Sequence, residues 1–118
     1  MANNALDLTT IAESLPTAQK IVLYDLLQSV RDTHNTVVPA YDLMNKLKRY
    51  SFYKYEGDRI PATLEADLEH LSKQGFLIYE KQRLTVDRIH WIVEPTERGM
   101  ELADYLSKKA RTILEENL

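Results

Sequence analysis

The sequence contains no cysteine and few glycines, and each shortage removes a class of function. Without cysteine there is no disulfide frame, no thiolate zinc site and no cysteine nucleophile. The glycines at 57, 75 and 99 stand alone, so neither the GxGxxG dinucleotide motif nor a phosphate-binding P-loop is present. The three histidines lack the spacing that places two metal ligands on one helical face, so we expect no metal and no cofactor.

Long apolar runs and an overall basic excess are also missing. No apolar run approaches the roughly 18 residues that a membrane span requires, and the first residues do not resemble a signal peptide. We therefore expect a cytoplasmic protein without a membrane partner. The net charge of −3 argues against a nucleic-acid binder that relies on broad phosphate neutralisation. Residues 37–59 differ from the chain as a whole, because they contain five Lys or Arg and only three acidic residues and so carry a local excess of positive charge.

The residues that are present predict a single domain over 1–118, of the α+β class and mostly helical. Its centre is a helix at 60–75, in which Leu64, Leu68 and Leu71 recur at spacings of four and three and form one apolar stripe. Pro61 suits the first turn of this helix, and Gly75 suits a left-handed residue just after its last turn. The opposite side carries small and polar residues, namely Ala62, Ala66, Glu69 and Lys73.

The remaining elements follow in a simple order. We expect an N-terminal extension at 1–16 with one short helix, a core helix at 17–31, a short edge strand at 36–38 and a helix that starts at Pro39. After the central helix, 76–81 and 88–94 predict an antiparallel pair of strands. The segment 82–87 has no glycine or asparagine and predicts a long, loose tip with Leu84 and Val86 exposed. A helix at 96–117 closes the chain.

A loop between the third and the central helix combines cations with aromatic residues. In one interpretation the loop binds nucleic acid: its cations would neutralise phosphates, and its aromatic side chains would bond backbone oxygens or stack on bases. An equally weighted alternative is that two of the aromatic residues pack beneath the loop and the lysines are only solvated. The candidate DNA-binding cations in and beside this loop are Lys46, Lys48, Arg49, Lys54 and Arg59.

The last helix carries a second pattern. Ala103, Leu106, Ala110 and Ile113 follow spacings of three, four and three, which is the seam of a short coiled coil. This seam predicts a homodimer, with the alternative that it packs back on its own domain.

The motif Thr63-Leu-x-x-x-Leu-x-x-Leu-x-x-x-Gly75-Phe-Leu, followed by a ribbon and then Thr96-x-x-Gly99-x-x-Leu102, resembles winged-helix transcription regulators. The likeness is to the PadR kind and, more loosely, to the MarR kind. It implies a winged helix-turn-helix with a C-terminal dimerisation helix, a recognition helix at 60–75 in the major groove of double-stranded DNA, and a wing at 76–94. By position, it places Arg59, Thr63 and Ala66 near base edges and Lys81, Arg83 and Arg88 on the wing.

One alternative of a different class stays open. Many winged helices bind proteins, and Glu65, Asp67 and Glu69 make the central helix acidic, so the chain is also compatible with a protein–protein interaction module. Docking would then use this acidic helix together with Leu84 and Val86. Enzymatic activity is not expected, because carboxylates on a surface helix lack the desolvation that tunes a general acid or base.

Overall fold

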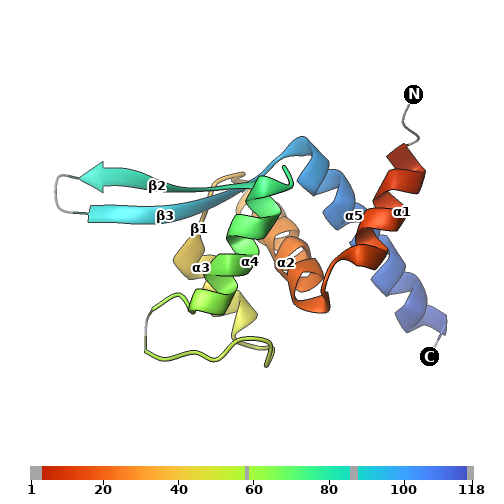
Figure 1. Cartoon of the computed structure of the whole chain (residues 1–118), viewed down its shortest axis with the longest axis horizontal. Coiled ribbons are helices and arrows are strands. Elements are labelled where there is room, and N and C mark those ends of the chain that lie inside the picture. The colour runs from red at the N-terminus through yellow and green to blue at the C-terminus, as the bar shows by residue number, and fades with distance from the viewer. Residues whose placement is uncertain (1–3, 58, 86–87, 117–118) are drawn as a thin grey trace.

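The computed structural model describes the backbone of residues 4–57, 59–85 and 88–116, and the side chains of 8–57, 59–81 and 90–109. This part of the chain contains five helices and a three-stranded antiparallel sheet, which confirms the mostly helical α+β class (Figure 1). The elements in chain order are α1 (Asn4–Ser14), α2 (Thr17–Thr33), β1 (Val38–Pro39), α3 (Ala40–Leu47), α4 (Ala62–Lys73), β2 (Leu77–Thr85), β3 (Arg88–Pro95) and α5 (Glu97–Glu116).

The central helix α4 is buried along the predicted leucine stripe. Leu64, Leu68 and Leu71 are at most 1% exposed, whereas the small residues on the opposite side are exposed to solvent. The helix ends as predicted, with Gly75 at φ +82°. The amide of Phe76 donates to the carbonyl of Leu71, and the amide of Gly75 donates to that of Ser72, each at 3.0 Å. These two bonds form a Schellman motif, which satisfies carbonyls that the helix end leaves unpaired.

The sheet has the order β1-β3-β2, and β2 and β3 form a ribbon that projects from the body (Figure 1). The predicted long tip at 82–87 is wrong, because β2 continues to Thr85 and β3 begins at Arg88. An irregularity between Arg83 and Thr85 absorbs the shift in pairing. Hydrogen bonds between strands join backbone groups. The segment 82–85 therefore pairs although its side chains do not mark it as part of a strand. The side chains of Leu84 and Val86 lie outside the described residues.

Thr96 fastens the end of α4, the start of β2 and the start of α5 together. Its amide donates to the carbonyl of Phe76 at 3.1 Å, and its hydroxyl donates to the carbonyl of Gly75 at 2.6 Å. The same hydroxyl oxygen caps α5 by accepting from the amide of Gly99 at 3.0 Å. The threonine and glycines of the sequence motif therefore meet at one junction.

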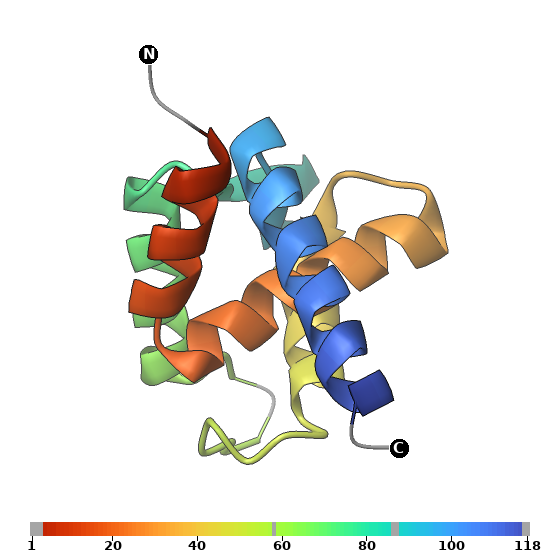
Figure 2. The same cartoon turned by 90° about the vertical axis from the view of Figure 1, so that its right-hand side faces the viewer.

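The long helix α5 forms the other side of the body from the ribbon. Its first half packs against α2, and α1 lies beside it on the outer surface (Figure 2). The hydroxyls of Thr9 and Tyr105 are 3.3 Å apart and join α1 to α5. Leu102 and Ala103 are buried in a core that also receives side chains from every other helix. Among the described residues, no helix is both long enough and apolar enough to cross a membrane.

We predict that Gly99→Ala destabilises the protein although alanine favours helices by about 1 kcal/mol over glycine. A Cβ at this position would lie 1.7 Å from the carbonyl oxygen of Phe76, which is backbone and is held by Thr96. The expected loss is about 2 kcal/mol or more in the free energy of unfolding, measured by urea denaturation. The matched control is Glu101→Ala on the exposed side of α5, for which we expect less than about 0.5 kcal/mol. A stabilised Gly99→Ala protein would contradict this packing.

Candidate nucleic-acid interface

The outward side of α4 lies between two other segments. The loop 48–61 passes below the start of this helix, and the ribbon projects beside its far end (Figure 1). The loop is long and irregular, as predicted. Both segments lie away from α1 and α5, which occupy the opposite side of the body (Figure 1). The outward side of α4, the loop 48–61 and the ribbon together carry most of the predicted DNA-binding residues.

Tyr53 anchors the loop to the side of α4. Its side chain is buried, and its hydroxyl donates to Asp67 Oδ2 at 2.6 Å. The side-chain nitrogen Nε2 of Gln19 donates to Asp67 Oδ1 at 3.0 Å, so this carboxylate joins the loop, α2 and α4. Burial, followed by the hydrogen bond to Asp67, raises the pKa of Tyr53, so its hydroxyl keeps its proton and remains a donor. Tyr53 therefore packs under the loop, and Tyr50 and Tyr55 are partly buried against the same core, in agreement with the alternative that two loop aromatics pack there.

A second anchor joins the loop to α2. The carboxylate of Asp25 is fully buried, and Arg49 donates to its Oδ1 at 2.6 Å from a side chain that is 54% exposed. Burial raises the pKa of Asp25, while the hydrogen bond and charge of Arg49 oppose that rise. The guanidinium also lies 4.9 Å from the ring centroid of Tyr50. Arg49 was predicted to bind DNA, and its first role here is to compensate a buried charge.

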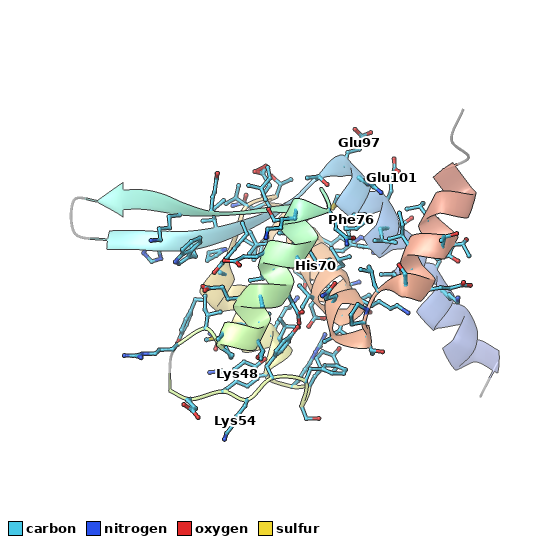
Figure 3. The ribbon with its side chains drawn as sticks, viewed as in Figure 1. Lys48, Lys54, His70, Phe76, Glu97 and Glu101 are labelled. Carbon is cyan, nitrogen blue, oxygen red and sulfur yellow. The ribbon has the colours of Figure 1, made fainter. Side chains whose placement is uncertain are left out.

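The other predicted cations of this region differ in what they contact. Lys46 pairs with Asp32 at 3.1 Å, on the side of α2. Lys48 lies 5.7 Å from the ring centroid of Tyr55, and Figure 3 shows it and Lys54 along the loop below α4. The Lys54 side chain is 90% exposed and only 4.0 Å from Glu56, a contact that contributes little in water. Arg59 is exposed as well.

The three carboxylates of α4 do not all lie on its outward side. Ala66 and Glu69 are exposed, as expected for residues that point away from the leucines, and Thr63 is exposed as well. Asp67 is engaged by Tyr53, and Glu65 accepts a hydrogen bond of 3.0 Å from the hydroxyl of Tyr79. Two of the three carboxylates on α4 are therefore held on its flanks by neighbouring side chains.

The ribbon contributes a cation beside an aromatic pair. Lys81 is exposed, and its ammonium lies 5.0 Å from the ring centroid of Trp91. Trp91 in turn stacks on Tyr79 with centroids 4.5 Å apart. The side chains of Arg83 and Arg88, also predicted to contact DNA, lie outside the described residues.

The predicted dimer seam is mostly unavailable in its first half. Ala103 is 2% exposed and packs in the core of its own chain, and Leu106 is half-buried against that core. The burial of Ala103 agrees with the alternative that the seam packs on its own domain. The side chains of Ala110 and Ile113 lie outside the described residues, so the homodimer stays a prediction.

Within the part of the chain that the structure describes, no group of three or more acidic or histidine side chains is placed to hold a metal ion. No family model, no curated protein and no solved structure matches this chain.

The carboxylate anchors were missed from the sequence. Asp25 follows Val22 at a spacing of three and precedes Ser29 at a spacing of four, and all three are buried. A charge on a buried helical side signals a required partner, although the spacing alone does not identify Arg49. The partners of Asp67 and Glu65 come from the loop and the ribbon, which helical periodicity does not place.

We predict that Tyr53→Phe and Tyr55→Phe have different effects although each removes one buried hydroxyl from the same loop. The first leaves Asp67 without a short hydrogen bond, and we expect a loss of about 1.5 kcal/mol or more in the free energy of unfolding. The Tyr55 hydroxyl has no partner among the described residues, so its removal should be neutral or stabilising. Urea denaturation of both variants measures the contrast. Equal losses would show that the Tyr53 to Asp67 bond does not stabilise the loop.

The Asp25 to Arg49 pair predicts a pH-dependent stability. Between the ordinary pKa of Asp25 and its raised value, the folded state keeps a proton that the unfolded chain has released. The free energy of unfolding therefore falls as the pH rises through this window. In Arg49→Ala the carboxylate loses its cation, so the window widens. We expect a loss of about 2 kcal/mol near pH 7 and a much smaller loss at about pH 4, where a protonated Asp25 needs no cation.

The control for this pair is Arg31→Ala, which breaks the exposed pair with Asp104 and should cost less than about 1 kcal/mol at either pH. Urea denaturation at both pH values measures the two variants. Equal losses for Arg49→Ala at the two pH values would mean that Arg49 stabilises the loop through Tyr50 and not through the buried charge.

Proposed function

We propose that this chain is a winged helix-turn-helix protein that binds double-stranded DNA and regulates transcription as a homodimer. In this proposal α4 is the recognition helix, the ribbon is the wing, and α5 is the helix on the dimer side. After α1, the order of three helices (α2, α3 and α4), the ribbon β2–β3 and the closing helix α5 supports it, with β1 as a third strand beside the ribbon. This is the arrangement that such DNA-binding folds require.

One observation carries the proposal. The leucine side of α4 is buried, and its outward side presents Thr63 and Ala66 between the exposed cations of the loop and the exposed Lys81 of the ribbon. Small side chains let a helix approach the floor of the major groove, and flanking cations meet the phosphates on either side. Lys54 and Arg59 would contact one phosphate strand, and Lys81 would contact the backbone near the wing.

The distribution of charge on α4 removes an objection to DNA binding. Three carboxylates on a recognition helix would repel phosphates if all of them faced the groove. Helical spacing places Asp67 and Glu65 on the flanks, where they accept the hydrogen bonds of Tyr53 and Tyr79, so the outward side carries Glu69 and Lys73 as opposite charges. The side chains that would meet the DNA are therefore close to neutral, with cations at their margins.

The homodimer in this proposal uses the side of α1 and α5. That side lies opposite the ribbon and the loop, so association there would leave the DNA-binding residues exposed (Figure 1). Two recognition helices of such a dimer would reach successive major grooves about 34 Å apart. Nuclease footprinting would then give two protected regions one helical turn apart, whereas a monomer would protect a single region.

A protein-interaction module is the second candidate. Its support is the exposure of Tyr41 and Ile78, at 44% and 40%, on α3 and β2. A contiguous patch of such side chains would mark a docking surface, whereas single ones are common on any protein, so this support is weak. The exposed cations around α4 have no role in this candidate, which is why we rank it second.

We predict that Lys54→Ala combined with Arg59→Ala weakens binding to every DNA fragment at least tenfold at low salt. Each lost phosphate contact reduces the slope of log K against log salt by about 0.9, so the slope should fall by about 2. Filter binding to genomic fragments, including the region upstream of the gene, at two salt concentrations measures both quantities. The control is Lys108→Ala combined with Lys109→Ala, which changes the net charge equally; because α5 lies on the proposed dimer side, its elution size on a sizing column must match that of the wild type. No retention of any fragment at low salt would overturn the proposal.

A further inference from the structure

The ribbon has two unlike faces. Alternation along the strands places Tyr79, Lys81 and Trp91 on one face, whereas Ile78 and Glu80 lie on the other. The first face combines stacked rings with a cation, and the second combines an exposed apolar side chain with an exposed carboxylate. A ribbon that served only to cover the core would not need a cation on an aromatic pair near its middle.

Trp91 occupies a defined position within this face. It pairs in register with Lys81, and Tyr79 stacks on it from the side of the ribbon nearer the body, with centroids 4.5 Å apart and planes at 21°. The hydroxyl of Tyr79 donates to Glu65 of α4 at 3.0 Å, so the stack is tied to the central helix. The indole is therefore held at a fixed place relative to α4 and is still partly exposed.

We propose that this face of the ribbon is a stacking platform for an unpaired nucleobase, with Trp91 against the base and Lys81 against its phosphate. Single-stranded nucleic acid is bound by this combination of aromatic ring and neighbouring cation, because every base presents a π-face and every nucleotide a negative charge. The inference rests on the proposed DNA-binding function and adds that the wing takes bases that have left the duplex.

Lys81 lies over the indole but does not block access to it. Its side chain is exposed, and a cation over an exposed ring is only weakly held. An incoming base displaces the ammonium from the indole, and the ammonium then pairs with the phosphate of the same nucleotide. The carboxylate of Glu65, which accepts from Tyr79, lies at the body end of the stack and would repel a phosphate there. We therefore expect the phosphate on the side of the stack toward the tip of the ribbon.

The experiment uses the single tryptophan of the chain as its reporter. The intact protein is titrated with three DNA probes, namely an oligothymidylate, a fully paired duplex and the same duplex with one central unpaired thymidine. Stacking on the indole should quench its fluorescence with the oligothymidylate and with the interrupted duplex, and not with the paired duplex. Binding of all three is followed independently by the anisotropy of a label on the DNA.

Variants separate stacking from packing. Trp91→Leu should lower the affinity for the oligothymidylate about tenfold and leave the affinity for the paired duplex unchanged, while Trp91→Phe should retain most of the affinity. Lys81→Ala should weaken the oligothymidylate complex and flatten its salt dependence, and Arg31→Ala at the exposed end of α2 is its matched control. These two surface changes keep the test valid if Trp91→Leu fails to fold.

The failures of the two proposals are distinguishable. If the paired duplex binds and the oligothymidylate does not quench Trp91, the platform is wrong and DNA regulation stands. If Trp91→Leu weakens paired and unpaired DNA equally, Trp91 only positions the ribbon and the platform is again overturned. If no probe binds at low salt, both proposals are wrong.

Discussion

Burial of the leucine stripe of α4 is the constraint on which the rest of the structure depends. Fully burying a leucine side chain stabilises a protein by roughly 1.5–3 kcal/mol, so Leu64, Leu68 and Leu71 together fix the rotation of this helix about its axis. A rotation of one residue position would expose the stripe and bury Glu65, Glu69 and Ser72 in its place. The outward side of α4 is thus determined by what its inward side contacts.

Two phenol to carboxylate hydrogen bonds then set what lies beside that outward side. Tyr53 brings the loop to Asp67, and Tyr79 brings the ribbon to Glu65, so both flanks of α4 are tied to neighbouring segments. Hydrogen bonds to ionised carboxylates are stronger than those between neutral groups. Helical spacing places both acceptor carboxylates on the flanks of α4, so the face proposed to meet DNA carries Glu69 and Lys73. The orientation of α4 therefore decides both which carboxylates anchor the neighbouring segments and which charges lie on the candidate interface.

The sequence predicts the local parts of this structure well and the distant contacts poorly. Periodicity and Gly75 predict the stripe and the C-terminal end of α4, whereas the start was placed two residues too early, since Pro61 is the N-cap and not part of the first turn. The paired length of the ribbon was underestimated, since partners across strands extend pairing beyond what turn residues indicate. The Asp25 to Arg49 pair joins residues that are 24 positions apart, and helical spacing does not predict such a partner. Arg49 therefore read as a surface cation although it compensates a buried charge.

The central claim is that DNA meets the outward side of α4 together with the loop and the ribbon. Amide chemical shifts, measured by NMR on the intact chain as a paired duplex is added at low salt, test it most directly. The account predicts that the largest changes fall on Lys54, Thr63, Ala66 and Lys81, with little change along α1 and α5. Changes confined to α1 and α5, or no changes at a concentration that saturates the DNA, would contradict it.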